Sequence, residues 1–210
     1  MFRLFGASAC SRRGAILADV RLFVVAATLG VFAALWGAPA PAQAQFVQQA
    51  GPLTGTGSSG TAKQGYAVAI AADGNTAIVG GPSDNSSVGA AWVYVRAANG
   101  AWTQQGGKLV GTGFTGASQQ GFSVALSADG NTALVGGNAD YSGDGAVWVF
   151  TRNGAGVWSQ QARLSDDAGS GGQAQFGHSV AVSADGNTAL VGGPAAAGND
   201  GAAWIFKRSG

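Results

Sequence analysis

The chain has 210 residues, of which 37 are Gly, only 10% are charged and none is Glu. The few Pro and the lack of a Gly at every third position exclude collagen, the Gly content argues against a helical bundle, and 46% apolar residues argue against disorder. A formal net charge of +1 predicts no nucleic-acid partner, and the single Cys10 excludes an intrachain disulfide and a cysteine-based zinc site.

Residues 1–44 have the pattern of a secretory signal peptide. Four Arg precede an apolar run of 15 residues from Leu22 to Trp36, and the small-x-small sequence Ala42-Gln43-Ala44 follows. We expect cleavage after Ala44. The run is shorter than the roughly 20 residues of a membrane-spanning helix, so no membrane span is expected after cleavage. The mature chain is expected to be secreted, extracellular or periplasmic, by a route that the sequence leaves open.

The rest of the chain repeats with a period of 56 residues. The sequence Asp-Gly-Asn-Thr-Ala recurs at this spacing, and so does a Trp that follows it. The markers are Asp73, Asp129 and Asp185 for the first pattern, and Trp92, Trp148 and Trp204 for the second. We therefore divide residues 45–210 into units at about 65–120, 121–176 and 177–210, preceded by residues 45–53.

Each complete unit is predicted to contain four short β-strands. Large and small residues alternate from Tyr66 to Ala71, a period typical of a strand, and the following Asp-Gly-Asn predicts a tight hairpin turn. In the first unit the expected strands are 66–71, 76–80, 90–96 and about 102–105, in the second 122–127, 132–136, 146–152 and about 158–161, and in the third 178–183, 188–192 and 202–208.

Four antiparallel strands in a unit of this length indicate a β-propeller blade, so the predicted fold class is all-β. Small residues occupy one face of each unit and large residues the other, which favours sheets stacked closely around an axis. A β-solenoid is the alternative architecture, but its coils are usually shorter and lack hairpin turns.

Residues 45–53 match the fourth strand of a unit, because Phe46-Val47-Gln48-Gln49 precedes Trp102-Thr103-Gln104-Gln105 by 56 positions. In a closed ring this lone strand would complete the last blade. Three units are fewer than the roughly four to eight blades of a closed propeller. Three interpretations follow: part of a longer product, self-association of two chains into a six-bladed propeller, or an open arc.

The units carry two short motifs at fixed positions. The third unit has Phe176-Gly177-His178 at its start and Val191-Gly192-Gly193-Pro194 after its second strand. The first unit has Gln64-Gly65-Tyr66 and Val79-Gly80-Gly81-Pro82, and the second has Gln120-Gly121-Phe122 and Gly136-Gly137-Asn138. Over about 160 residues the chain resembles FG-GAP repeats, which form the blades of integrin α-chain propellers and of many secreted bacterial proteins.

The resemblance implies a seven-bladed propeller in the integrin-like case, an extracellular location, and cell adhesion or protein binding. It also implies calcium where a repeat has an Asp-x-Asp-x-Asp-Gly loop between its first two strands. Here the segment from Ala72 to Thr76 supplies one carboxylate and is too short for an ion that takes about 6–8 oxygen ligands. We interpret Asp73, Asp129 and Asp185 as turn residues and do not transfer the calcium function.

Another loop provides the best candidate calcium ligands. Asn138, Asp140, Ser142 and Asp144 place oxygen atoms at positions 1, 3, 5 and 7, with Gly at position 6, as at the start of an EF-hand loop. The closing Glu is replaced by Val149. A polar loop without metal is the simpler interpretation, and no other cofactor is expected.

No catalytic set is evident, so we predict a non-enzyme. The segment around Ser179 is slightly similar to a hydrolase nucleophile elbow, but Ser179 and His178 should point to opposite faces of one strand, and the chain has no second His. Trp102 and Trp158, on the expected outer strands, are candidates for ligand contact by stacking on sugars; packing between strands is the alternative.

The recurring arginines Arg96, Arg152 and Arg208 are interpreted as solvated strand ends or partners of nearby Asp. The sequence as a whole favours a secreted FG-GAP-type propeller that acts as a non-catalytic binding or adhesion module for an extracellular protein or glycan. The alternatives are a glycan-binding lectin and a structural scaffold fragment of a larger extracellular protein.

Overall fold

A computed structural model describes residues 45–166 and 173–209 of the chain. The expected signal peptide, with Cys10, lies outside these residues. The chain divides after Val47, and the unit from Gln48 to Gly210 contains all of the described secondary structure. None of the described helices is both long and apolar enough to cross a membrane.

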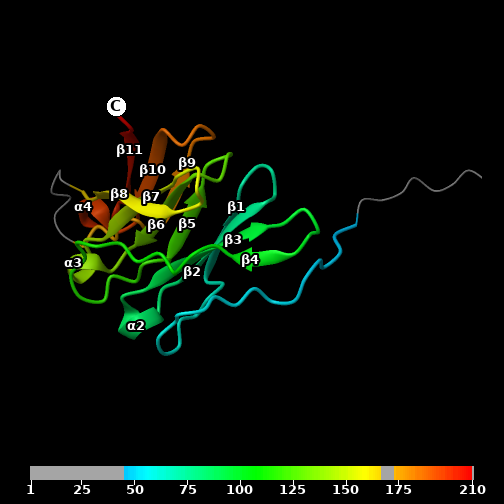
Figure 1. The fold of residues 1–210 in the computed structure, drawn as a ribbon. Helices are drawn as coiled ribbons and strands as arrows, with labels where there is room; N and C mark the ends of the chain where they lie inside the picture. The colour runs from blue at the N-terminus through cyan, green and yellow to red at the C-terminus, as the bar shows by residue number, and fades with distance from the viewer. Residues whose placement is uncertain (1–44, 167–172, 210) are drawn as a thin grey trace, which may run out of the picture. The chain divides into compact units, whose positions relative to one another are not determined.

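The fold is all-β, with three antiparallel sheets that follow one another along the chain (Figure 1). Each sheet is one blade and corresponds to one 56-residue unit. Blade 1 contains β1 (Ala67–Ile70), β2 (Thr76–Gly81), β3 (Ala90–Arg96) and β4 (Trp102–Gln104). Blade 2 contains β5 (Ser123–Leu126), β6 (Thr132–Gly137), β7 (Ala146–Arg152) and β8 (Trp158–Leu164). Blade 3 contains β9 (Ser179–Val182), β10 (Thr188–Gly193) and β11 (Ala202–Lys207).

The strands agree with the expected ranges to within about two residues, apart from the longer β8, and sequential strands pair in each sheet. The described part of blade 3 ends at β11, in agreement with the three strands expected for the third unit. One difference concerns residues 45–53, which were expected to form a lone fourth strand and form no strand. Phe46 and Val47 are exposed.

The hairpin turns form as expected from Asp-Gly-Asn. The carboxylate of Asp73 accepts a hydrogen bond from the backbone N–H of Asn75 at 2.8 Å, and those of Asp129 and Asp185 accept the equivalent bonds. Side-chain bonding of this kind stabilises a turn locally. The interpretation of these three residues as turn formers is therefore confirmed.

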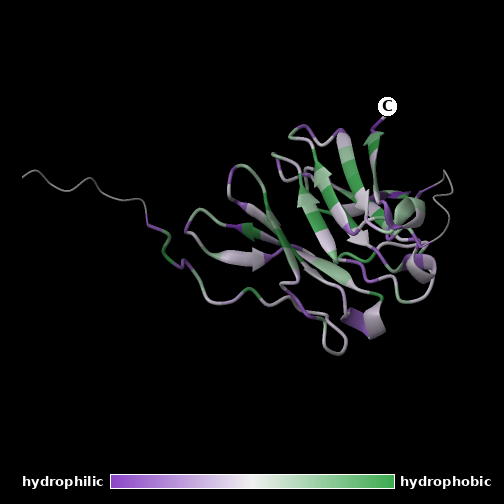
Figure 2. Ribbon diagram, turned by 180° about the vertical axis from the view of Figure 1, so that it is seen from behind, coloured by the Kyte–Doolittle hydropathy of each residue, from purple (hydrophilic) through white to green (hydrophobic). Residues whose placement is uncertain are grey.

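The blades stack through apolar faces, with β5 in contact with both β1 and β9. Blade 1 offers smaller residues such as Ile78 and Val93 to the larger Trp148 and Phe150 of blade 2, and all four are buried. Blade 2 contacts blade 3 in the same way, through a cluster that includes Leu134 and Phe176. Figure 2 shows the hydrophobic residues concentrated on the strands. The predicted arrangement of small against large faces is therefore present.

Polar bonds also join the blades. The guanidinium of Arg152 on blade 2 donates to Thr76 Oγ1 at 3.3 Å and to Gln105 Oε1 at 3.1 Å, both on blade 1. Arg208 on blade 3 donates to Thr132 Oγ1 on blade 2 at 3.2 Å. For Arg152 and Arg208, the interpretation as solvated strand ends or partners of Asp is thus replaced by one of interblade contact.

A one-turn element connects the second and third strands of each blade where the sequence indicated only a loop. These elements are α2 (Asp84–Ser87), α3 (Asp140–Gly143) and α4 (Ala196–Asn199). Each has two central residues with positive φ, such as Asn85 and Ser86 in α2. The chain therefore reverses sharply at these points, and the first residue of each element is buried.

Candidate functional site

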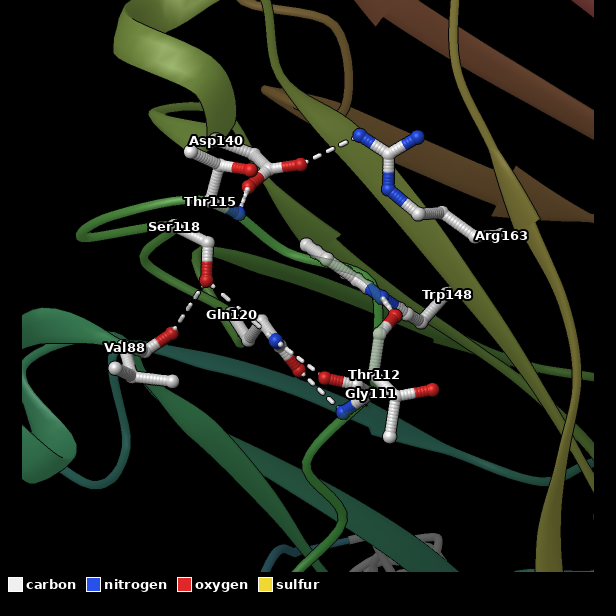
Figure 3. Close-up of polar contacts among 9 residues, drawn as sticks. All are labelled: Val88, Gly111, Thr112, Thr115, Ser118, Gln120, Asp140, Trp148 and Arg163. Carbon is white, nitrogen blue, oxygen red and sulfur yellow. Dashed lines mark hydrogen bonds and ion pairs between the residues drawn. The ribbon is translucent and has the colours of Figure 1, made fainter.

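The carboxylate of Asp140, at the start of α3, is fully buried and has a partner on each oxygen (Figure 3). Oδ1 accepts the backbone N–H of Thr115 at 2.7 Å, and Oδ2 accepts a charged hydrogen bond from Arg163 at 2.6 Å. Arg163 lies on β8 and Thr115 on the segment that leads into blade 2. One carboxylate thus fixes α3 to two other parts of its blade.

Blade 1 repeats this arrangement around Asp84. Its Oδ1 accepts the backbone N–H of Ser59 at 2.7 Å, and its Oδ2 pairs with the ammonium of Lys108. Asp84 lies 56 positions before Asp140 in a loop without the EF-hand spacing. The shared role of the two aspartates is therefore to anchor the loop, and blade 3 has the buried Ala196 at this position.

The other candidate calcium ligands lie near Asp140 in sequence but have separate environments. Asp144 accepts the backbone N–H of Gln173 at 2.6 Å, and Ser142 has a φ of +62°. Asn138 Oδ1 is buried and has no hydrogen-bond partner among the described residues. The described chain contains no group of three His, Cys, Asp or Glu residues arranged for a metal. Calcium at this loop stays a prediction, and it would have to compete with Arg163 for Asp140.

A second network places the central Trp of blades 1 and 2. Gln120 is fully buried, and its side-chain amide makes a two-way bond with the backbone of Gly111, at 2.6 Å and 3.0 Å (Figure 3). The indole N–H of Trp148 donates to Thr112 O at 2.9 Å. Gln64, Gly55, Thr56 and Trp92 make the same bonds in blade 1. These residues are structural in the described chain.

The proposed ligand-contact residues Trp102 and Trp158 are each half-buried, on β4 and β8. Trp158 packs against the core between blades 1 and 2, and its indole N–H donates to Gln105 Oε1 at 3.1 Å. The guanidinium of Arg152 lies 5.4 Å from the centre of its ring. Trp102 packs beside the core of blade 1. Both side chains have packing roles that limit the ring surface left for a sugar.

A row of aromatic side chains at the starts of the first strands was not anticipated as a site. The ring of Phe122 lies 5.0 Å from that of Tyr66 and 4.9 Å from that of His178. Tyr66 is 53% exposed. These residues come from three blades, 56 positions apart, and their strands are the ones that approach one another most directly. They therefore lie on the side of the stack nearest the propeller axis.

A cavity of about 130 Å³ opens beside two of these rings. Its lining comprises Lys63, Tyr66, Pro82, Ser83, Gln119 and Phe122. It combines aromatic surface with an ammonium, a hydroxyl and an amide, which is the composition of a small polar-ligand site. We define this group of residues as the axial aromatic cleft.

A larger cavity of about 230 Å³ lies between blades 2 and 3. Leu134, Val149 and Gln161 line it from blade 2, and Phe206 and Arg208 from blade 3. At the equivalent position between blades 1 and 2, the half-buried Trp158 contributes to the core. The cavity therefore marks the place of an aromatic residue of a fourth strand, which the described part of blade 3 does not supply.

The sequence analysis missed two equivalent ion pairs, which are Asp84–Lys108 in blade 1 and Asp140–Arg163 in blade 2. The recurrence of Asp at positions 84 and 140 was a usable signal. The cations were harder to match, because Lys108 and Arg163 differ in type and lie 55 rather than 56 positions apart. A register shift between β7 and β8, at Val149/Phe150, accompanies this change in spacing.

No family model and no curated protein matches the chain. Among solved structures, the chain is similar to the periplasmic gluconolactonase PpgL of Pseudomonas aeruginosa, with 19% identity and a TM-score of 0.47 over 67% of this chain and 38% of that one. Another similar structure is Sqt1 of Saccharomyces cerevisiae, with 13% identity and a TM-score of 0.44 over 71% of this chain and 33% of that one.

A functionally unknown protein from Desulfotomaculum acetoxidans matches with 14% identity and a TM-score of 0.37 over 61% of this chain and 48% of that one. The chain thus spans about a third to a half of the length of these three structures.

Proposed function

We propose that this chain is a secreted, non-catalytic binding module of the propeller type, and that its binding surface is the axial aromatic cleft. The observation that carries the proposal is the cavity between blades 1 and 2, which opens beside the rings of Tyr66 and Phe122. The ring of His178, from blade 3, continues this aromatic row beyond Phe122. Loops and strand ends of a rigid stack are where binding residues usually lie.

The polar residues of the cleft support binding rather than packing. Lys63 and Tyr66 are exposed, and Ser83 and Gln119 are partly exposed, so their donors and acceptors are open to a ligand. The cavity is smaller than the roughly 300 Å³ at which drug-sized ligand pockets begin. It therefore suits one projecting group, such as a protein side chain or a terminal sugar.

A glycan is one specific candidate for the ligand of the cleft. The second proposed function is therefore that of a glycan-binding lectin. Sugar rings stack on exposed aromatic faces while their hydroxyls bond to nearby polar groups, and the exposed Tyr66 offers such a face beside Lys63 and the half-buried Phe122. Trp102 and Trp158 are half-buried, whereas Tyr66 is 53% exposed. We therefore move the proposed sugar contact from the outer strands to the cleft.

The test is a glycan array probed with the labelled chain and with Tyr66→Ala. We expect binding to fall at least about tenfold in Tyr66→Ala, because a stacking face worth about 1.4 kcal/mol is lost. Tyr141→Ala is the matched control, since Tyr141 is 63% exposed on α3, outside the cleft. Equal loss in both variants, or unchanged binding by Tyr66→Ala, contradicts the site.

Cells treated with glycosidases distinguish the two ligand classes. Labelled protein that still binds after glycan removal, and loses binding after protease treatment, recognises a protein and acts as an adhesion module. Binding that disappears with the glycans identifies a lectin. Absence of binding to cells and arrays alike supports the scaffold alternative.

A further inference from the structure

Both ends of the blade stack expose apolar side chains. On blade 1, Val68 and Ile70 of β1 are 67% and 60% exposed. On blade 3, Leu190 of β10 and Ile205 of β11 are 45% and 74% exposed. We call these surfaces the blade 1 face and the blade 3 face. Exposed neighbouring apolar groups of this kind commonly mark an interaction surface.

The two faces are complementary, because each repeats one side of a contact already present inside the chain. Leu190 and Ile205 lie 56 positions after Leu134 and Val149, which blade 2 buries against blade 3. Val68 lies 56 positions before Val124, which blade 2 buries against blade 1. The blade 3 face and the blade 1 face are therefore equivalent to the two surfaces that already pack together between neighbouring blades.

Polar groups on the blade 1 face also lack the partners that their equivalents have. Arg152 and Arg208 each bond to a Thr of the preceding blade. In both cases a terminal guanidinium nitrogen makes this bond, and the equivalent Arg96 has no described blade before it to supply such a Thr. By the repeat, that Thr would be Thr188, on the blade 3 face of another blade stack.

The cavity between blades 2 and 3 indicates which segment accompanies that contact. Phe46 lies 56 positions before Trp102, which places it in register with the aromatic residue Trp158 of the fourth strand. Arg208 and Gln161 line the cavity as Arg152 and Gln105 surround Trp158. The edge of β11 that would receive this strand is unpaired in the described chain.

The same chain cannot supply the strand to its own blade 3. Phe46 lies nine positions before Gly55, and Trp102 lies nine positions before Gly111. Gly55 lies against Trp92 of blade 1, as Gly111 lies against Trp148 of blade 2. Residues 46–49 can therefore complete only a blade that lies directly against the blade 1 face. Blade 2 covers the opposite side of blade 1, and blade 3 lies beyond blade 2.

We propose that the occupant of both faces is a second copy of this chain, joined head to tail. The blade 3 face of each copy packs on the blade 1 face of the other. Residues 46–49 then pair with β11 of the second copy, and Phe46 enters the cavity between its blades 2 and 3. Two such contacts make a six-bladed ring of two chains, and this inference does not depend on the ligand proposed above.

The test is the mass of the purified chain in solution, by light scattering after size exclusion and by sedimentation velocity. We expect a two-chain species at micromolar concentration. Val68→Asp and Ile205→Asp each place a charge in one face and are expected to give monomers. Phe46→Ala is expected to raise the dissociation constant at least about tenfold. Val157→Asp is the control, because Val157 is 58% exposed in the β7–β8 turn and lies on neither face.

Mixing the two charged variants tests the head-to-tail geometry. Ile205→Asp retains an intact blade 1 face and Val68→Asp an intact blade 3 face, so together they should form a two-chain species through one contact. This result also shows that both variants are folded. A monomeric wild type up to about 100 µM, or a dimer that survives either charged substitution, overturns the proposal, as does a failure of the folded mixed variants to associate.

Discussion

Asp140 illustrates how much one side chain can determine in this fold. Its buried carboxylate holds Thr115 and Arg163 together across the blade. The regular spacing of oxygen-bearing residues around it suggested a calcium loop, and spacing alone could not reveal that an arginine 23 positions later would occupy one of its oxygens. The recurrence of the arrangement at Asp84, with a lysine as the cation, identifies loop anchoring as the role common to both.

Asp140→Ala is expected to destabilise the chain by about 2–3 kcal/mol, because it leaves the Thr115 N–H and the guanidinium of Arg163 without their partner. Arg163 is partly exposed and can recover some hydration, which keeps the loss below that of a fully buried pair. Urea denaturation measures the effect. Asp200→Ala, which removes an exposed carboxylate, should change the free energy of unfolding by no more than about 0.5 kcal/mol. Similar losses in both variants would contradict the anchoring role.

The carboxylate of Asp129 is expected to make the stability of the fold depend on pH. The Ser127 hydroxyl and then the Asn131 N–H bond to its carboxylate and lower its pKa below the ordinary 3.8. Because the folded pKa is the lower one, the resulting stability is present above pH 3.8 and is lost as the pH falls through the folded pKa. Carboxyl NMR titration should show a higher pKa for Asp129 in Ser127→Ala. An unchanged pKa would show that the hydroxyl contributes little.

At the scale of single elements, the strands and the Asp-Gly-Asn hairpin turns were predictable, and the connections between the second and third strands were not. The alternation from Tyr66 to Ala71 predicted β1 because a strand places successive side chains on opposite faces. The lengths of β4 and β8 depend on subtler differences. Gly106, with a φ of +74°, follows β4, whereas Ala162 and Arg163 continue β8. The buried starts of α2 and α3 depend on tertiary partners that no local pattern contains.

The loop that contains Gly111 crosses closely over Trp148, the central Trp of blade 2. A Cβ on Gly111 would lie 2.0 Å from Trp148 Cδ1, so Gly111→Ala must move the loop or the indole ring. We expect a loss of about 2–3 kcal/mol in thermal or urea unfolding, in the range of overpacked cores. Gly107→Ala is the matched control, because a Cβ there has open space. A loss of less than about 0.5 kcal/mol in Gly111→Ala would mean that the loop shifts freely.

For the whole molecule, the 56-residue period allowed blades and stacking to be foreseen, since identical units bury their faces only against one another. It could not locate the axial aromatic cleft or the row of rings that runs past it. The row consists of Tyr66, Phe122 and His178, which are different residue types, and only the stacking of β1, β5 and β9 brings their rings together. The number of blades in an assembly likewise depends on the terminal faces rather than on any one unit.

Hydrogen exchange should reveal a gradient of stability across the stack. The amides of Ile78, Leu134 and Leu190 occupy the same place in the central strands β2, β6 and β10, but within the described chain only blade 2 has another blade on each of its faces. In dilute solution we expect exchange at Leu134 to be slower by roughly tenfold or more than at the other two. Equal protection of the three amides under these conditions would contradict the stacking contribution.

The aromatic row also acts as a spacer that sets curvature. Its rings hold the first strands of neighbouring blades apart, at 5.0 Å and 4.9 Å between ring centres, on the side nearest the axis. Head-to-tail contacts close into a ring only when the rotation from blade to blade completes a turn, and otherwise they grow into an open helical filament. For the proposed head-to-tail assembly, we therefore expect side-chain volume at positions 66, 122 and 178 to decide between a closed ring and an open filament.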